Sequence, residues 1–548
     1  MSSKFSPLDL VETVGNKLPD PAMLFVMGTL FVMACSFIAS ATGWEVQPKR
    51  LVAETTITTN ELGEQVEMPV LDDAGEPVLA LVADDVEPFR AVSLLSPDGL
   101  YWALSSMVDN FINFPPLGVV LVGMLGIGLA ERTGFIGAVL KAMMLVVPKS
   151  LLTPTMVFLG IMSSLGTDAG YVVLPPVAAV LYKSVGRSPL AGVAAVFAGV
   201  AAGFNANLMV TSLDPLLSEL STAGAQTIDP DLAVPATANW WFMIASTFVI
   251  TLVGWFTSAA FVERRFKNKS AEDGGPSPLT DEDLAHQSIF ASEKKGLLAA
   301  VPSLVIAAGI FVTAVLVPNA PLNDARGQLP GDNFDRWVEA IVPMLFFLFL
   351  VPGVVYGIVA GSLRNSKDAA RLMTETMASM APIVVLAFFA GQFIAYFQYS
   401  NLDKMLAHTG GQFLATADMH PAMLVAAFIL LTAFFNLFVG SMSAKWAMFA
   451  PIFVPMLMLV GIHPALTQCA YRIGDSVTNI ITPLNAYLII VLVVMQRFAP
   501  KAGMGTLIAM MTPYSVMFLI AWTIMLLVWM SLGFDLGDGG PLFYTPQN

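Results

Sequence analysis

Charged residues are scarce in this sequence, which excludes the composition of an ordinary soluble domain. Asp, Glu, Lys and Arg make up 12% of the 548 residues, whereas a soluble domain carries about 25%. Hydrophobic residues reach 56% instead and gather in long runs. A helix needs about 20 apolar residues to cross a bilayer, and the runs do not alternate as barrel strands do. The composition predicts an all-α polytopic membrane protein.

Cysteine, histidine and nucleotide-binding motifs are also scarce. Cys35 and Cys469 both lie in apolar runs, so we expect neither a disulfide framework nor a thiolate metal site. The 4 histidines lack metal-ligand spacing. The phosphate-binding pattern G-x-x-x-x-G-K-[ST] is absent, as are metal-protease motifs. We therefore expect neither an ATP-driven pump nor an enzyme, and no cofactor. The net charge is −14, and we expect no nucleic-acid partner.

The charges of the loops predict the topology. Loops 262–295 and 362–372 and the link Arg497–Lys501 are basic, so they are placed in the cytoplasm. Residues 43–98 and 318–336 are acidic and are placed outside. This arrangement requires nine crossings of a bacterial inner membrane, with a cytoplasmic N-terminus and an extracytoplasmic C-terminus. The expected spans are 22–42, 112–131, 189–225, 238–261, 296–317, 338–361, 379–398, 464–497 and 503–532.

Two further apolar segments, 151–184 and 421–460, are interrupted by polar patches. The patches run from Ser163 to Asp168 and from Gly440 to Lys445. Because both ends of each segment must lie on one side, we interpret them as two re-entrant hairpins that enter from opposite faces. Spans 189–225 and 464–497 are too long for one straight helix and contain polar residues at mid-length, which indicates broken helices.

The two halves of the chain resemble each other. Pro175, Gly186-Arg187-Ser188-Pro189, Gly199 and Asn205 match Pro451, Gly461-Ile462-His463-Pro464, Gly474 and Asn479, at an offset of 274–276 residues. An amphipathic stretch precedes each hairpin, at 134–149 and 401–413. Two halves that contain the same elements in opposite orientation across the membrane form the inverted repeat typical of a secondary transporter. The expected organisation is 1–21 cytoplasmic N-terminus, 22–42 first span, 43–111 acidic extracytoplasmic loop, 112–261 first repeat, 262–295 cytoplasmic linker, 296–361 two spans, 379–532 second repeat and 533–548 extracytoplasmic C-terminus.

Arg472 and Asp475 are the leading candidates for the site. They lie three residues apart and share a helix face. Charge inside a bilayer is costly and marks function by default. The guanidinium of Arg472 offers a planar fork for a substrate carboxylate. Asp475 then orients Arg472, binds a coupling cation or carries a proton. The alternative is a structural ion pair that holds the broken helix.

Trp446 and Lys445 follow the polar tip of the second hairpin. Trp446 is placed to stack on an aromatic ligand, and core packing is the alternative. Lys445 caps carbonyls, holds a second carboxylate or is structural. Asp168 and Asp214 are each a coupling site or a helix cap. Neutral oxygens at the breaks either bind substrate or Na⁺ or satisfy the interrupted backbone; they belong to Ser441, Ser443, Asn205, Asn207, Asn479 and Thr482.

Four stretches resemble the p-aminobenzoyl-glutamate transporter (AbgT) family, over about residues 5–532. They read GSMSAKWAMFAPIFVPM, YRIGDSVTNIITPLNAY, SSLGTDAGYVVLPP and NANLMVTSLDPL. The resemblance implies a homodimer whose protomers each have nine transmembrane helices and two re-entrant hairpins. It also implies functional roles for Asp214, Ser443, Trp446, Pro464, Arg472, Asp475 and Pro483. The two prolines shape the site by starting and breaking helices. Residues 43–98 are longer than is usual in the family.

The expected function is secondary active transport of p-aminobenzoyl-glutamate, or of related aromatic acids or sulfonamides, coupled to Na⁺ or H⁺. The alternatives are a dicarboxylate carrier of similar inverted-repeat design and a proton-driven sulfonamide or antimetabolite exporter. A membrane-embedded enzyme or a passive channel explains the paired broken helices less well. The direction of transport stays open.

Overall fold

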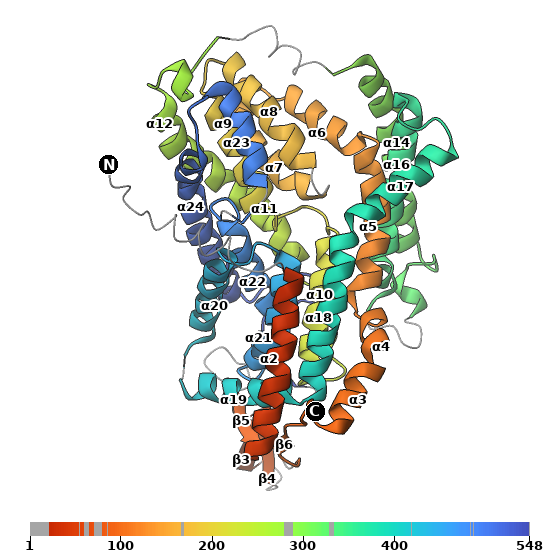
Figure 1. Ribbon diagram of the computed structural model, residues 1–548, viewed down its shortest axis with the longest axis vertical. Coiled ribbons are helices and arrows are strands. Elements are labelled where there is room, and N and C mark those ends of the chain that lie inside the picture. The colour runs from red at the N-terminus through yellow and green to blue at the C-terminus, as the bar shows by residue number, and fades with distance from the viewer. Residues whose placement is uncertain are drawn as a thin grey trace.

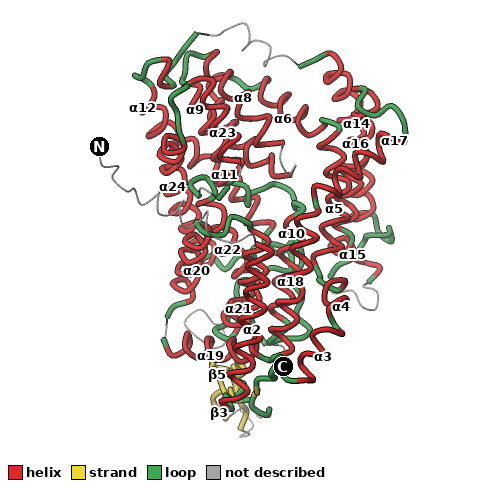
Figure 2. The backbone as a smooth tube through the Cα atoms, viewed as in Figure 1, coloured by secondary structure: helices red, strands yellow, loops and turns green. Residues whose placement is uncertain are grey.

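The computed structural model describes residues 21–53, 55–59, 65–70, 79–84, 86–165, 169–278, 289–327, 334–417, 419–482, 484–485 and 487–546. Most of them are helical (Figures 1 and 2). Several predicted features lie outside this part of the chain: most of the N-terminal segment, parts of the acidic loop, Asp168, the middle of the cytoplasmic linker and Pro483.

The long apolar helices match most of the expected spans. Six helices in the described residues are long and apolar enough to cross a membrane. They are α2 (Pro21–Thr42), α11 (Trp240–Thr257), which continues through η4 (Ser258–Val262) into α12 (Glu263–Phe266), α14 (Ala291–Leu316), α16 (Ile341–Ala360), α18 (Ala381–Tyr399) and α24 (Met504–Ser531). A seventh candidate is α5 (Pro116–Arg132), which bends by 58° into α6 (Phe135–Leu145). The linker is shorter than expected, because helix continues to Phe266 and resumes at Ala291.

Shorter helices replace long ones where the sequence has polar interruptions. In the first half these are α7 (Leu152–Met162) with η2 (Ser163–Leu165), α8 (Ala169–Ser184), α9 (Pro189–Phe197) with the π-turn η3 (Ala198–Ala202), and α10 (Leu213–Ala225). In the second half they are α20 (Pro421–Asn436), α21 (Met442–Met458), α22 (Pro464–Thr478) and α23 (Tyr487–Phe498). The remaining helices are α3 (Pro97–Ser105), α4 (Met107–Ile112), η1 (Lys149–Leu151), η5 (Ala271–Asp273), η6 (Asp324–Arg326), α15 (Arg336–Glu339), α17 (Ser366–Ser379) and α19 (Leu402–Thr416).

The matched motifs of the two halves adopt the same local structure. Gly186 and Gly461 both have the left-handed backbone that glycine favours, with φ of 71° and 81°. Each is followed by a residue that caps the next helix, and a proline then fills the first turn of α9 and α22. Gly199 and Gly474 each lie against the backbone of a hairpin helix, where a Cβ would meet a carbonyl oxygen. Both halves therefore use glycine for the same close helix contact.

The described strands of the acidic region 43–98 form three two-stranded antiparallel sheets, called the ribbon below. Three antiparallel pairings follow one another: β1 (Glu45–Val46) with β6 (Phe89–Arg90), β2 (Lys49–Ala53) with β5 (Leu79–Ala83), and β3 (Thr55–Thr59) with β4 (Gln65–Pro69). The ribbon lies at the lower end of the view beside α19 (Figure 1). It is anchored there, because the backbone N–H of Lys49 donates to Nδ1 of His408 at 3.1 Å.

Candidate functional site

Helix α22 carries the two candidate charges and lies wholly inside the protein. All 15 of its residues are buried, and the helix lies centrally in Figure 1. Proline at its first position and the ring of His463, whose Nδ1 accepts from the Ala465 N–H at 3.1 Å, fix its start. Because the surroundings of Arg472 and Asp475 contain little water, each charge needs a partner from another element.

The partner of Arg472 is Asp214, at the start of α10. A guanidinium nitrogen of Arg472 contacts Oδ1 of Asp214, and the other carboxylate oxygen accepts from the backbone N–H and the hydroxyl of Thr211. In this conformation Asp214, and not Asp475, contacts the guanidinium of Arg472; the three roles considered for Asp475 stay predictions. Nε of Arg472 has no hydrogen-bond partner among the described residues, so the predicted carboxylate grip stays a prediction.

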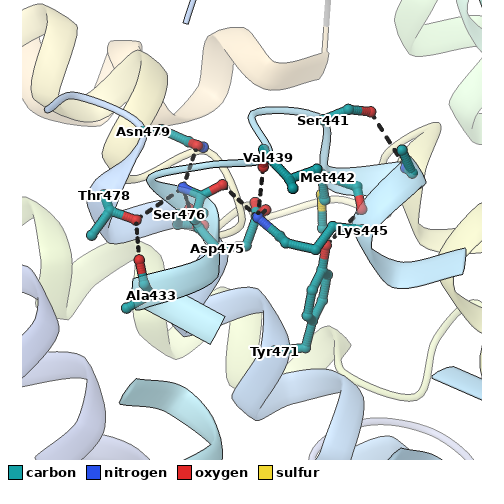
Figure 3. A network of polar contacts seen from close by, with 12 residues as sticks. Ala433, Val439, Ser441, Met442, Lys445, Tyr471, Asp475, Ser476, Thr478 and Asn479 are labelled. Atoms are coloured by element: carbon teal, nitrogen blue, oxygen red, sulfur yellow. Dashed lines mark hydrogen bonds and ion pairs between the residues drawn. The ribbon is translucent and has the colours of Figure 1, made fainter. Parts of the chain in front are cut away.

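The partner of Asp475 is Lys445, on α21. Nζ of Lys445 lies 2.6 Å from Oδ1 of Asp475, and both side chains are 1% exposed. Figure 3 shows this pair between the end of α22 and the loop that contains Val439. Asn436 closes the network: its Oδ1 accepts from Lys445, and its Nδ2 donates to the Asp475 carbonyl at 2.6 Å and to Thr478 Oγ1 at 2.9 Å.

Asn436 was not among the sequence candidates. It is a lone amide at the end of an otherwise apolar helix, immediately before the polar tip. A buried side-chain amide needs several hydrogen-bond partners. A single amide within an apolar run is therefore the sequence signal that could have identified Asn436. Gln468, whose side chain contacts Ser221 and Asn239 within the same buried layer, was missed as well.

Trp446 lies in the core of this structure rather than facing a cavity. Its side chain is 0% exposed. The indole N–H donates to the Leu217 carbonyl at 3.1 Å and to Ser221 Oγ at 3.2 Å. The ring lies 4.4 Å from that of Tyr471, centroid to centroid. In this conformation the packing role predicted as the alternative is the one observed, and Trp446 joins α21, α10 and α22.

The neutral candidates mostly satisfy interrupted backbone. Ser441 caps α21 by accepting from the Ala444 N–H at 3.3 Å. Thr482 donates to the Leu437 carbonyl at 3.1 Å. The remaining contacts join the two halves and the first hairpin: Asn205 donates to the Arg472 carbonyl and Ser476, Asn479 to the Ala201 carbonyl, and Asn207 to Ser164. Pro464 starts α22. Asn205 and Asn479 thereby tie their helix breaks to the opposite repeat, whereas Asn207 ties its break to the hairpin of its own repeat.

A cavity of about 610 Å³ lies between the two hairpins. Ser443 is the candidate that lines it directly. Tyr171 and Tyr487 face the cavity as a stacked pair, with ring centroids 3.9 Å apart. Other lining residues come from the first hairpin tip, the first helix break, α5 and α17; they include Ser163, Ser164, Phe204, Ser212, Leu213, Glu131, Arg132 and Thr376. The cavity thus offers aromatic faces, hydroxyl groups, one cationic side chain and one carboxylate.

Metal-ligand geometry gives no further candidate. Among the residues that the structure describes, no three His, Cys, Asp or Glu side chains are grouped so that they could hold a metal ion. The sequence-based expectation of Na⁺ at helix breaks concerns neutral oxygens instead, and it stays a prediction.

A family model and a relative that spans the chain give the same family. The model of the AbgT putative transporter family matches residues 6–544. The chain is 33% identical to the p-aminobenzoyl-glutamate transport protein of Escherichia coli K12 over 530 residues, which cover 96% of this chain and 95% of that protein.

Two solved structures are similar over almost the whole chain. The Alcanivorax borkumensis YdaH transporter, described as having an unusual topology, is 37% identical with a TM-score of 0.79, over 95% of this chain and 100% of that chain. Neisseria gonorrhoeae MtrF, described as illuminating a class of antimetabolite efflux pumps, is 38% identical with a TM-score of 0.83, over 97% of this chain and 100% of that chain. With a mostly helical fold and a family match that spans the chain, this protein belongs to the AbgT putative transporter family.

Proposed function

We propose that this protein is a secondary active transporter of p-aminobenzoyl-glutamate, or of a related aromatic acid or sulfonamide. The observation that carries the proposal is the cavity of about 610 Å³ between the two hairpins. Its volume falls within the roughly 300–1,000 Å³ of small-molecule sites. The stacked tyrosines suit an aromatic ring, and the hydroxyl groups suit amide and carboxylate oxygens.

The topology that we propose has nine membrane crossings and two re-entrant hairpins. Helix α7 has 11 residues, about 17 Å at 1.5 Å per residue, which is too short for a hydrocarbon core of about 30 Å. Helices α6 to α9 occupy the upper part of Figure 1 and α19 to α21 the lower part, which supports hairpins that enter from opposite faces. We place the N-terminus in the cytoplasm and the C-terminus outside the inner membrane, in a homodimer.

Cysteine labelling tests this topology. In a background without Cys35 and Cys469, Ser150→Cys and Ser184→Cys should both react with an impermeant reagent from the cytoplasmic face only. Reaction from opposite faces would mean that 151–184 crosses the membrane, and the inverted repeat would then be wrong.

Antimetabolite export is the second candidate, favoured by the 38% identity to MtrF. Import and export use the same cavity and differ in which gradient drives which step, so both belong to one experiment. The dicarboxylate carrier of similar design stays an alternative, which the stacked tyrosines do not favour.

Reconstitution in liposomes tests substrate and coupling together. Labelled p-aminobenzoyl-glutamate and a labelled sulfonamide are offered under separate Na⁺ and H⁺ gradients. We expect gradient-dependent flux that Arg472→Lys reduces by about tenfold or more, because lysine lacks the bidentate fork. Arg371→Lys, on an exposed part of α17, is the matched control. Flux of an aliphatic dicarboxylate, without flux of either aromatic compound, would instead support the dicarboxylate alternative.

A further inference from the structure

The tip of the second hairpin surrounds one ammonium group with oxygen atoms. Lys445 is 1% exposed. Its Nζ lies 2.6 Å from Oδ1 of Asp475, contacts Oδ1 of Asn436, and lies 3.4 Å from the carbonyl oxygen of Val439. Figure 3 shows Lys445 reaching back from α21 toward Val439 and Asp475. The three oxygens equal the three N–H donors of an ammonium group.

This set of oxygens is also what a small monovalent cation needs. A carboxylate, an amide oxygen and a carbonyl from non-helical chain are the ligands that transporters present to Na⁺ at broken helices. The ring of Tyr471 lies 5.8 Å from Nζ, centroid to nitrogen, and its face attracts cations as well. Oxygen atoms and an aromatic face therefore surround the position of the positive charge.

The repeat itself does not require this ion pair. At the 274–276 offset, Lys445 corresponds to Ala169, Gly170 or Tyr171, and Asp475 corresponds to Val200 when Gly474 is matched with Gly199. The first half therefore has neither charge at these positions. Since a buried ion pair loses hydration and contributes little net stability, its presence in one half only points to a role beyond holding the fold.

We propose that Lys445 is a tethered cation that fills a monovalent-cation site at the second hairpin. Its ammonium neutralises Asp475 and joins the hairpin tip to the end of α22, as a bound ion would. The proposal rests on the transporter function proposed above and adds to it: in the wild-type protein no dissolved cation binds at this site, and any coupling cation binds elsewhere.

Emptying the site tests the proposal. Lys445→Ala is purified in detergent, and its thermal unfolding is followed in choline chloride, NaCl, KCl and methylammonium chloride at equal ionic strength. We expect a lower Tm than wild type in choline, and a rise with Na⁺ or methylammonium that saturates as single-site binding requires. Wild type should show no rise with methylammonium. Any Na⁺ response of wild type belongs to a coupling site elsewhere, so each variant is compared with wild type in the same salt.

Three controls assign the effect to this site. Lys141→Ala removes a lysine that pairs with Glu293 at 3.1 Å outside the network and should show no cation response beyond that of wild type. Lys445→Met fills the same space with an uncharged chain and should show none either. Adding Asp475→Asn to Lys445→Ala should weaken the apparent cation affinity by about tenfold or more, since a charged ligand is lost.

Lys445→Gly, which leaves more room for an ion and its water, is measured in parallel. If neither small variant responds to Na⁺ or to methylammonium, including by failing to fold in every salt, the proposal is overturned. If the response persists unchanged with Asp475→Asn, the cation binds elsewhere and the proposal is equally wrong. Unfolding is followed without substrate, so the two proposals can fail separately. A negative transport assay would not affect the cation-site test, and a negative unfolding test would not affect the transport proposal.

Discussion

Neutralising one member of the Arg472–Asp214 pair should destabilise the protein more than neutralising both. The two side chains are 3% and 0% exposed. Asp214→Asn leaves the Arg472 charge buried without its counterion. Arg472→Gln leaves Oδ1 of Asp214 without its cation, although Thr211 still holds the other carboxylate oxygen. Breaking a buried pair on one side costs about 3–5 kcal/mol.

The double variant contains no uncompensated charge. Two independent losses would sum to roughly 6–10 kcal/mol. We expect the double variant to lose no more than about the larger single value, so the coupling energy should be at least about 3 kcal/mol. The effect of Asp214→Asn should be the larger one, because Nε of Arg472 already lacks a hydrogen-bond partner among the described residues.

A double-mutant cycle on the purified protein measures this coupling. Unfolding of wild type, the two single variants and the double variant is followed in detergent under identical conditions. The exposed pair Arg371–Glu375, 3.0 Å apart on α17, serves as the control, and its coupling should stay within about 0.5 kcal/mol. Additive losses at Arg472 and Asp214 would refute the reasoning, because the two charges would then not depend on each other.

Three further predictions concern groups outside the ion pairs, each followed through the Tm of the purified protein. Burial lowers the pKa of His463 from 6.5 to about 4. The protein should therefore keep its full free energy of unfolding above pH 6.5 and lose up to roughly 3 kcal/mol of it as the pH falls to 4. His463→Asn, which still caps α22, should remove that loss. Burial raises the pKa of Asp403 from 3.8 to about 6, so Asp403→Asn should stabilise the protein by up to about 3 kcal/mol at pH 7.5 and have no effect below pH 3.8. Gly199→Ala and Gly474→Ala should each lower the free energy of unfolding by roughly 1–3 kcal/mol, because the added methyl group meets backbone. Gly505→Ala, in open space on α24, is the control and should not lower it. Equal losses at all three sites would contradict this account.

The repeat motifs show what local sequence determines. The motifs Gly186-Arg187-Ser188-Pro189 and Gly461-Ile462-His463-Pro464 were matched as parts of a repeat, which implies the same local structure in both halves, and Pro464 was predicted to start a helix. The structure has both, because a left-handed turn and a proline in the first helical turn depend on only a few adjacent residues. In the same way, runs of about 20 apolar residues predicted helices such as α2, α16 and α24. The polar residues within 189–225 and 464–497 likewise predicted the places where helix gives way to irregular chain.

The pairing of the charges was decided by the tertiary structure alone. Three-residue spacing places Arg472 and Asp475 on one face of α22, and the sequence therefore favoured a local pair. In the folded protein Arg472 instead contacts Asp214, 258 residues earlier in the chain, and Asp475 contacts Lys445. Helix periodicity fixes only the direction of a side chain from its own helix. Which opposite charge lies there depends on how α10 and α21 pack against α22, and no local pattern of residues specifies that packing.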